Sequence, residues 1–316
     1  MADDPPRLLV IKLGALGDFV QALGPFAAIR RHHAGARVTL LTTQPYAALA
    51  AASPYFDAVW IDERPRPWRL GAWLDLRRRL KRGRFARVYD LQTSDRSSFY
   101  FRLFWPGPTP EWSGIAAGCS HPHANPRRDF MHTIERQAEQ LDLAGIAAVP
   151  PPDLSWAKAD LGRFAIGPRF ALIAPGGAAH RPNKRWPDDR YAQLAARLVD
   201  VGVTPVLLGQ SSEALSLERI RTAAPVAINL AGRTTLLDVI GLARAAALAV
   251  GNDTGPMHLA AVAGAPSLVL YSDESNPALC AQRGPSVTIL RKTRLADLSV
   301  DDVASSALRL IRATAQ

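Results

Sequence analysis

Residues 250–261, Val-Gly-Asn-Asp-Thr-Gly-Pro-Met-His-Leu-Ala-Ala, decide the fold of this chain. The apolar run 247–250 is typical of a buried strand, a polar turn with two glycines follows it, and a helix is predicted from about residue 255. Thr254 is placed to cap that helix, whose first N–H groups would face the carboxyl end of the sheet. Aimed donors and the partial positive charge of a helix start predict an anion site in this turn.

The same alternation of apolar strand, turn and amphipathic helix recurs along the chain in two series. In the first series, strands are predicted at 7–13, 37–42, 58–61 and 86–91, and helices at about 18–33 and 68–81. In the second, strands are predicted at 169–174, 205–208, 226–229, 247–250 and 267–270, and helices at 188–201, 213–221, 235–244 and from about 255. Fully apolar strands that alternate with helices indicate parallel sheets covered on both faces.

A proline-rich stretch, 149–156, separates the two series and is interpreted as a linker, because prolines cannot continue a helix or a central strand. We therefore predict an α/β fold with two doubly wound domains, 1–152 and 153–316, that face each other across a cleft. In such sheets, ligands bind beyond the carboxyl ends of the strands. The last helix, about 300–313, is expected to pack back across the first domain.

Length and composition limit the class of protein. A chain of 316 residues favours two domains, and 48% hydrophobic with 21% charged residues excludes wholesale disorder. No run approaches the roughly 18 apolar residues of a spanning helix, which argues against an integral membrane protein. The start of the chain is acidic and Lys12 interrupts its first apolar stretch, so a signal peptide is not expected. Two distant cysteines, Cys119 and Cys280, form neither a disulfide framework nor a zinc site, and a cytoplasmic location is expected.

The net charge of +10 is concentrated in one segment. Twelve basic and three acidic residues lie between Arg64 and Arg102, so this segment carries nine of the ten net positive charges. A run of this kind is compatible with a solvated helix face, or with an anionic ligand, an anionic membrane surface or nucleic acid as partner. Aromatic residues occur in the segment without the regular interleaving of a stacking ribbon, which disfavours nucleic acid.

The first predicted strand leads into the glycine turn Gly14-Ala-Leu-Gly-Asp18. This GxxG spacing lacks the third glycine of a dinucleotide fingerprint, so a dehydrogenase is disfavoured. Asp18 lies where a helix-capping residue belongs, and capping alone would explain an aspartate there. The functional alternative is a carboxylate that accepts a proton at the ligand site.

The loop after the strand at 169–174 contains Pro175-Gly-Gly177 and then Lys184-Arg-Trp-Pro187. It is not a P-loop, so kinase and ATPase chemistry lose their main support. Backbone N–H groups at Gly176 together with Lys184 could bind a diphosphate, although a basic surface loop explains the same residues. In the turn quoted first, His258 could donate to a phosphate or ribose, or it could be a core histidine. Asp253 suits sugar hydroxyls, so the set points to a nucleotide sugar.

Three segments, Gly14–Asp18, Lys184–Pro187 and Gly251–His258, resemble the bacterial ADP-heptose:lipopolysaccharide heptosyltransferases. The resemblance implies the GT-B architecture, with two Rossmann-like domains, the acceptor on the first and the nucleotide sugar on the second. It also implies an inverting transfer from ADP-heptose that needs neither a metal ion nor a cofactor.

Site residues follow from the resemblance position by position. Asp18 matches the proposed general base and Lys184 the lysine that binds the phosphates and supports catalysis. For the nucleotide sugar the resemblance implies Gly176, Lys184, Glu213 on the ribose, Asp253 on the sugar, and the phosphate-binding turn with Thr254, Gly255, Met257 and His258. For the acceptor it implies Gly17, Gln92, Arg96 and some of the three arginines Arg64, Arg66 and Arg69, without deciding among them. No metal ligand is expected.

The implied acceptor is the phosphorylated, carboxylate-bearing inner core on lipid A in the cytoplasmic leaflet, and arginine forks suit both anions. A cytoplasmic enzyme in peripheral contact with the inner membrane is therefore expected. A GT-B glycosyltransferase of the same family that uses another nucleotide sugar or a protein acceptor is the nearest alternative. A non-catalytic nucleotide- or nucleic-acid-binding protein is the alternative of another class. The sequence leaves the heptose-transfer step and the oligomeric state open.

Overall fold

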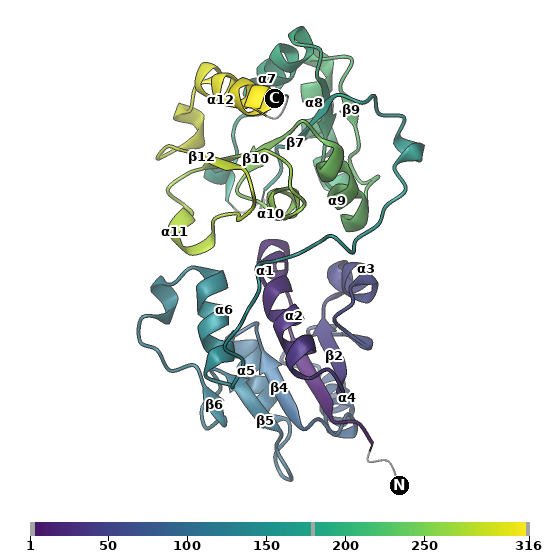
Figure 1. The fold of residues 1–316 in the computed structure, drawn as a ribbon, viewed down its shortest axis with the longest axis vertical. Helices are drawn as coiled ribbons and strands as arrows, with labels where there is room; N and C mark the ends of the chain where they lie inside the picture. The colour runs from purple at the N-terminus through teal and green to yellow at the C-terminus, as the bar shows by residue number, and fades with distance from the viewer. Residues whose placement is uncertain (1–3, 178–180, 314–316) are drawn as a thin grey trace. The chain divides into compact units, whose positions relative to one another are not determined.

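The computed structural model describes residues 4–177 and 181–313, and the chain divides into two compact units, residues 1–152 and 153–316 (Figure 1). Within the described residues each unit contains one six-stranded sheet in which every neighbouring pair of strands is parallel. The predicted fold class, α/β with two doubly wound parallel sheets, is confirmed.

The first unit alternates strands and helices from its start. Its strands are β1 (Arg7–Ile11), β2 (Arg37–Thr42), β3 (Ala58–Ile61), β4 (Arg87–Asp90), β5 (Glu111–Gly114) and β6 (His121–Pro122). Its helices are α1 (Leu16–Gln21), α2 (Leu23–His32), α3 (Gln44–Ala52), α4 (Leu70–Arg82), α5 (Asp95–Arg102) and α6 (Thr133–Asp142). The strand order is β3-β2-β1-β4-β5-β6, so the order reverses between β1 and β4.

The second unit repeats this arrangement. Its strands are β7 (Phe170–Ala174), β8 (Thr204–Leu207), β9 (Ile228–Asn229), β10 (Leu248–Asn252), β11 (Ser267–Tyr271) and β12 (Val287–Arg291). Its helices are α7 (Asp188–Asp200), α8 (Ala214–Ala223), α9 (Leu236–Ala245), α10 (Gly255–Val262), α11 (Pro277–Cys280) and α12 (Val300–Ala313), with short 3₁₀ turns η3 (Pro182–Lys184) and η4 (Ser211–Glu213) in the loops. The order β12-β11-β10-β7-β8-β9 reverses between β7 and β10. In open α/β sheets the carboxyl ends at such a reversal are where ligands bind.

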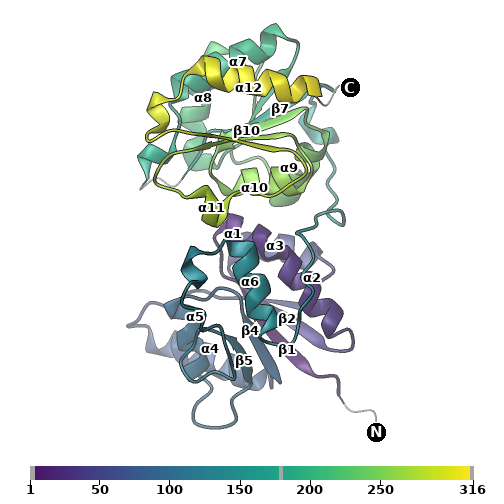
Figure 2. The same ribbon diagram turned by 60° about the vertical axis from the view of Figure 1, so that its left-hand side comes forward.

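Burial on both faces explains the near-continuous apolar strands. All five residues of β7 and all five of β10 are buried. In the first unit, α4 and α5 pack on one face of the sheet through Leu76, Leu80 and Tyr100, which join a core cluster with Leu9 and Ile11 of β1. Figure 2 shows these two helices on the face of the sheet opposite α2 and α6.

Several elements differ from the expectation, since helices α3, α5, α6 and α11 and strands β5, β6 and β12 were not predicted. The helix predicted over 18–33 is divided at Ala22, which ends α1 and begins α2. Strand β5 was not predicted, because Glu-Trp-Ser-Gly has no apolar run, and β12 extends the second sheet beyond the strand expected to complete it.

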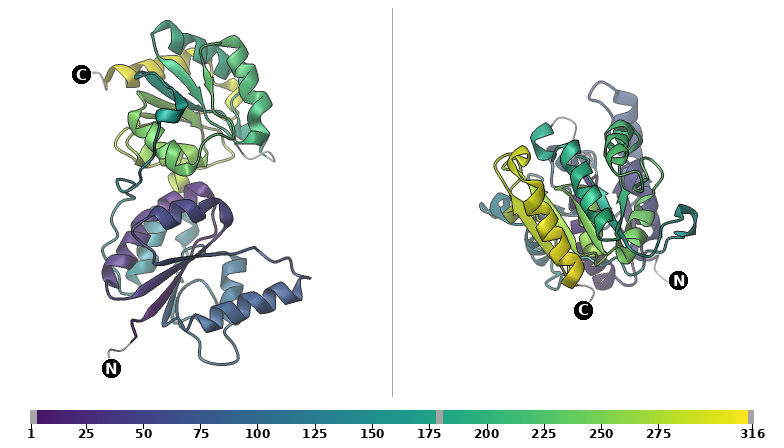
Figure 3. Two further views of the ribbon diagram at one scale, coloured as in Figure 1. Left: turned by 90° about the vertical axis from the view of Figure 1, so that its right-hand side faces the viewer. Right: turned by 90° about the horizontal axis from the view of Figure 1, so that it is seen from above.

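The expected packing of the last helix is corrected. Helix α12 packs on the second unit's own sheet, against α7, β10 and β11 (Figure 3). Its buried residues Ala304, Ala307 and Ile311 belong to the core cluster of that unit. The apolar stripe of α12 therefore has its partner within residues 153–316. No helix in the described ranges is long and apolar enough to cross a membrane.

Candidate functional site

Asp253 and Lys184 meet at the carboxyl end of the second sheet, where the strand order reverses. Asp253 directly follows β10, and Lys184 ends the turn η3 in the loop after β7. The Lys184 Nζ atom lies 3.2 Å from Asp253 Oδ2. Ser275 donates to the same oxygen at 2.7 Å, and Gln282 Nε2 donates to Oδ1 at 3.0 Å. Both charged side chains are largely buried, with 14% of Lys184 and 11% of Asp253 exposed.

The surroundings keep Asp253 ionised. Burial raises the pKa of its carboxyl, but the Ser275 hydrogen bond, the Lys184 charge and the Gln282 hydrogen bond together hold that pKa below its ordinary value. His258 Nε2 lies 4.0 Å from Asp253 Oδ1. A fixed carboxylate therefore holds a lysine at the position where the sequence predicted a diphosphate.

Asn252, the last residue of β10, positions this pair. Its Oδ1 accepts from the Trp186 backbone N–H at 3.1 Å and from the Tyr191 hydroxyl at 2.9 Å. Its Nδ2 donates to the carbonyls of Pro175 at 2.7 Å and Gly176 at 3.1 Å. One side chain, itself fully buried, thus joins the loop after β7, the segment that carries Lys184, and the start of α7.

The start of α10 differs in detail from the expectation. Thr254 is the N-cap residue, but its hydroxyl donates to the Asn252 carbonyl at 3.2 Å and makes no capping bond to the helix. Gly255 opens the helix and Pro256 follows, while Met257 is 1% exposed and its sulfur packs close to Gly251. Any contact of Met257 with a ligand would therefore involve its backbone.

Glu213 lies beside the glycine turn after β7. Its Oε1 accepts from the Gly177 N–H at 3.3 Å and its Oε2 from the Gln210 N–H at 2.9 Å. A Cβ at Gly176 would collide with the Glu213 carboxylate, so a larger residue there would displace that carboxylate from its present position. The structure thus brings Gly176 and Glu213 together at one end of the sheet.

In the first unit, Asp18, Arg64 and Gln92 line one hollow of about 810 Å³. The remaining lining residues are Leu13, Gly14, Ala15, Thr43, Gln44, Pro45, Tyr46, Ile61, Asp62 and Glu63. Gln92 Oε1 accepts from the Leu13 N–H at 2.8 Å, and Arg64 Nη2 donates to the Leu13 carbonyl at 2.7 Å. Side chains from the loops after β1, β3 and β4 thus converge on the turn that carries Asp18.

Asp18 has a structural contact as well as a place in the hollow. It lies in the first turn of α1 and its Oδ2 accepts from the Ala15 N–H at 3.2 Å. Gly14 has φ +119°, and a Cβ there would meet the Tyr46 ring at 2.6 Å. Glycine is therefore required at this turn, and Asp18 remains only partly buried beside the hollow.

The other predicted acceptor residues lie apart from this hollow. Gly17 is in the first turn of α1, next to Asp18. Arg66 and Arg69 are exposed, and Arg66 stacks on Trp68 with its Cζ atom 5.4 Å from the ring centroid. Arg96 Nη1 donates to the Pro65 carbonyl at 3.3 Å, so it supports the backbone of the loop that carries Arg64 and Arg66.

Comparison with known proteins identifies the family. Residues 73–304 match the family described as glycosyltransferase family 9 (heptosyltransferase). The chain belongs to glycosyltransferase family 9. The resemblance seen in the sequence is confirmed by this match.

Relatives and solved structures agree with that assignment. Over 131 residues the chain is 36% identical to lipooligosaccharide heptosyltransferase 2 of Haemophilus influenzae; this match covers 40% of the chain and 38% of the relative's length. The structure of E. coli ADP-heptose lps heptosyltransferase II superposes with a TM-score of 0.79 and 20% identity, over 98% of this chain and 100% of that one. A family 9 glycosyl transferase from Veillonella parvula gives a TM-score of 0.82 at 18% identity, over 99% of both chains. These likenesses confirm the GT-B fold.

Sequence reasoning assigned no role to two buried charged residues of this family 9 protein, Asp90 and Lys12. Asp90 ends β4, is fully buried, and accepts from the N–H groups of Gln92 at 3.1 Å and Thr93 at 3.0 Å. Burial raises its pKa to about 6, although the hydrogen bonds and the Lys12 charge oppose that rise. Lys12 is also buried and its Nζ donates to the Leu91 carbonyl at 3.0 Å. A charged residue in an apolar strand was the available signal for both positions.

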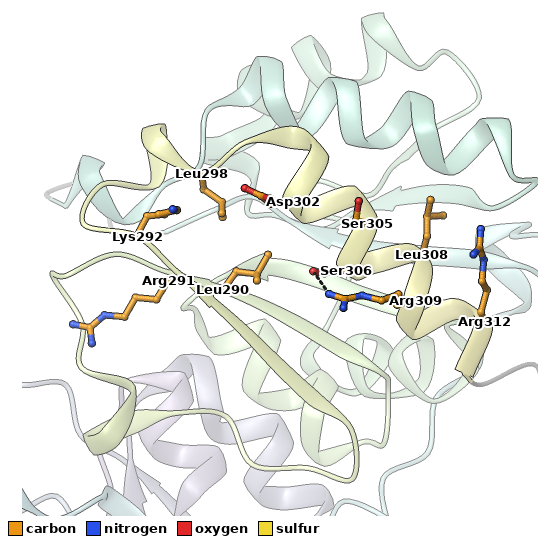
Figure 4. Close-up of a pocket in the computed structure, with 10 residues that line it drawn as sticks. All are labelled: Leu290, Arg291, Lys292, Leu298, Asp302, Ser305, Ser306, Leu308, Arg309 and Arg312. Carbon is orange, nitrogen blue, oxygen red and sulfur yellow. Dashed lines mark hydrogen bonds between the residues drawn. The ribbon is translucent and has the colours of Figure 1, made fainter.

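A second hollow of the family 9 chain, about 690 Å³, lies between β12 and α12 (Figure 4). It is lined by Leu290, Arg291, Lys292, Leu298, Asp302, Ser305, Ser306, Leu308, Arg309 and Arg312. In Figure 4 the Arg309 side chain turns toward Ser306, to which it donates at 3.0 Å. None of the predicted donor residues lines this hollow. Across the described part of the chain, no group of three or more His, Cys, Asp or Glu side chains is arranged to hold a metal ion.

Proposed function

We propose that this family 9 glycosyltransferase moves heptose from ADP-heptose to the inner core of lipopolysaccharide, with inversion at the anomeric carbon and without a metal ion. The Lys184–Asp253 pair at the carboxyl end of the second sheet carries the proposal, because it places a fixed cation where a nucleotide diphosphate would bind. The names of the Haemophilus influenzae relative and of the E. coli structure support heptose as the sugar and ADP as its carrier.

Asp18 is the proposed general base. Its carboxylate takes the proton of the attacking acceptor hydroxyl while the new bond from that oxygen to the anomeric carbon forms. The bond from the anomeric carbon to the β-phosphate oxygen breaks on the opposite side, and its electron pair leaves with ADP. A base in this role typically contributes 10²–10⁴-fold to the rate.

Lys184 and the start of α10 are proposed to stabilise the leaving diphosphate, whose charge grows in the transition state. The lysine is already held by Asp253 and the helix start is fixed to β10, so little reorganisation accompanies the reaction. Glu213 is proposed to bind the ribose, and His258 and the backbone at Thr254 and Gly255 the phosphates. Asp253 is proposed to contact the heptose as well as to hold Lys184.

The acceptor is proposed to bind the first unit. Arg64 lies in the hollow that contains Asp18, so a phosphate or carboxylate held by Arg64 would bring a neighbouring hydroxyl to the base. Such an acceptor is the anionic inner core carried by lipid A, which places the protein at the cytoplasmic face of the inner membrane.

Turnover of ADP-heptose tests the proposal. Truncated lipopolysaccharide acceptors are incubated with wild type, Asp18→Asn and Asp95→Asn, all in EDTA. Asp95 is the matched control, because it is also an acidic residue in the first turn of a first-unit helix. We expect EDTA-resistant turnover that falls about a hundredfold or more in Asp18→Asn alone, with ADP binding retained.

Each other result has a defined meaning. If Asp18→Asn stays active, Asp18 is a capping residue and the base lies elsewhere. Turnover of UDP- or GDP-sugars, or of a protein acceptor, would mean that the protein is a glycosyltransferase with substrates other than those proposed. Binding to nucleic acid that weakens steeply with salt and is unchanged by ADP would mean that the chain is a nucleic-acid-binding protein without catalytic activity.

A further inference from the structure

Five large apolar side chains are exposed on the outer side of α4 and α5. Trp68 is 71% exposed, Leu70 72%, Leu74 49%, Phe99 43% and Trp105 72%. We call this set the α4–α5 face. Single exposed apolar residues are ordinary, but several that lie together usually mark an interaction site.

Contacts show that the members of the α4–α5 face are neighbours. Arg77, three residues after Leu74 on α4, donates from Nη2 to the Trp105 carbonyl at 3.1 Å. Lys81, one further turn along α4, donates to the Pro106 carbonyl at 2.7 Å. Trp73 stacks edge-on against Phe99 with ring centroids 5.3 Å apart. The loop after α5 is therefore held along α4 at Arg77 and Lys81, and Phe99 lies beside Trp73 in the first turn of α4.

The core does not account for these apolar residues. Helix α4 already has a buried side, on which Leu76 and Leu80 pack against the first sheet. Leu70 and Leu74 are spaced four residues apart and lie together on the solvent side. The helix is thus apolar on a second, exposed stripe as well as on its core stripe.

Basic side chains are frequent on the same segments as the exposed apolar residues. Those on α4, α5 and the preceding loop are Arg66, Arg69, Arg77, Arg78, Lys81, Arg82 and Arg102. Few acidic residues oppose them; Asp75 pairs with Arg78 at 3.0 Å, and Asp95 begins α5. Exposed tryptophan and leucine together with many lysines and arginines are the composition of surfaces that lie on anionic bilayers.

We propose that the α4–α5 face docks on the surface of an anionic lipid bilayer. Trp68, Leu70, Leu74 and Trp105 enter the headgroup region, and the arginines and Lys81 bind lipid phosphates. This deepens the proposed function, and rests on it in one respect: a lipid-borne acceptor gives the enzyme a reason to lie on a membrane.

Other occupants fit the face less well. A second copy of the chain placed symmetrically on it would bring the same basic side chains together, which is repulsive. Nucleic acid would use aromatic rings for stacking, but leucines at the centre of the face offer no stacking surface. An anionic bilayer satisfies the charge and the apolar stripe together.

Co-sedimentation with lipid vesicles tests the proposal. Wild type is mixed with vesicles of phosphatidylcholine alone or with added phosphatidylglycerol. Two double variants are compared: Leu74→Gln with Trp105→Gln, and Arg78→Gln with Arg102→Gln. Leu215→Gln with Arg219→Gln is the matched control, because it removes an exposed leucine and an exposed arginine from α8 of the second unit.

We expect wild type and control to bind the anionic vesicles and to bind phosphatidylcholine weakly. Loss of two basic residues should lower the partition coefficient about thirtyfold, and loss of Leu74 and Trp105 at least tenfold. Equal binding by all four proteins, or none by wild type, overturns the proposal. So does a concentration-dependent dimer that the double variants abolish, because a second copy would then occupy the face.

Turnover with a short, lipid-free acceptor separates this inference from the proposed function. We expect both face variants to keep wild-type turnover on that acceptor, because their substitutions lie outside the Asp18 hollow. If wild type binds vesicles but does not use ADP-heptose, the docking face stands and the donor assignment of the proposed function falls.

Discussion

The Lys184 ammonium lies 3.2 Å from the Asp253 carboxylate, and Ser275 and Gln282 bind the same carboxylate from the following loop. The lysine is therefore held by a partner that is itself fixed. An arriving diphosphate meets a cation whose position is set in advance, so less side-chain ordering is left for the binding step.

Replacing Lys184 should weaken ligand binding, whereas replacing Asp253 should lower stability. Lys184→Gln is expected to lower ADP affinity at least tenfold, because a charge-assisted contact to the diphosphate is lost. Asp253→Asn leaves a largely buried ammonium without its carboxylate. We expect it to reduce the free energy of unfolding by about 2 kcal/mol, below the 3–5 kcal/mol of a fully buried pair.

Calorimetric ADP titrations and urea unfolding of both single variants and the double variant measure these terms. Lys158→Gln, an exposed lysine of the same unit, is the control and should match wild type. Strictly additive effects in the double variant would contradict a coupled pair, for which a coupling of about 0.5–3 kcal/mol is expected.

Arg64 gives a test on the first unit. It donates to the Leu13 carbonyl at 2.7 Å in the hollow that contains Asp18, whereas Arg66 and Arg69 are exposed on the neighbouring loop. Neutralising all three to glutamine should raise the acceptor KM about tenfold or more, because charge-assisted contacts to the acceptor are removed.

The same triple variant should keep the ADP dissociation constant of wild type, since the proposed nucleotide residues belong to the second unit. Arg312→Gln, an arginine of the α12 hollow, is the control for the loss of positive charge. A loss of ADP affinity in the triple variant would refute the acceptor assignment.

Much of the fold could be predicted because the central strands are buried on both faces. Strands β2 and β3 begin and end at the predicted residues, 37–42 and 58–61. Strand β5 could not be found in this way, because its pairing with β4 and β6, and no apolar run, identifies Glu-Trp-Ser-Gly as a strand. The position of α12 also depended on tertiary packing, since an apolar stripe does not specify which sheet it covers.

The candidate site was predictable where a loop follows a strand, and less so where a contact joins distant segments. The loop after β10 was singled out by its glycines and its helix start. Asn252, which ends β10 just before that loop, was quoted without a role, because its four partners at Trp186, Tyr191, Pro175 and Gly176 are distant in sequence. A polar residue at the end of a buried strand is the general sequence signal for a side chain that joins distant segments.

Asn252→Ala should therefore affect both stability and ligand binding. It leaves two buried donors and two carbonyls without this partner, and we expect the free energy of unfolding to fall by about 2–4 kcal/mol. ADP affinity should fall as well, because the segment with Lys184 is no longer joined to β10. Tyr191→Phe removes one of the four hydrogen bonds and should cost about 1 kcal/mol with ADP affinity unchanged. Urea unfolding and ADP titration of both variants test this prediction. Equal losses of stability and of ADP affinity in the two variants would show that Asn252 does not join these segments.

Asp90 predicts a pH dependence of stability whose sign can be worked out. Burial raises the pKa of its carboxyl from an ordinary 3.8 to about 6. Between those two values the folded state holds a proton that the unfolded chain has released, so the free energy of unfolding falls as pH rises through this window. A gap of about two pH units corresponds to roughly 3 kcal/mol at neutral pH.

Asp90→Asn cannot ionise and should lose this dependence. His33, whose pKa burial and the neighbouring His32 and Arg87 charges lower to about 4, contributes the opposite slope in wild type and variant alike. The measured quantity is therefore the difference in unfolding free energy between Asp90→Asn and wild type at pH 4 and at pH 8. We expect the variant to gain roughly 2–3 kcal/mol relative to wild type over that interval, while Asp142→Asn, at an exposed position, gains nothing. A difference that stays constant with pH would mean that Asp90 has its ordinary pKa in the folded protein, and that Lys12 and the loop N–H groups fully offset its burial.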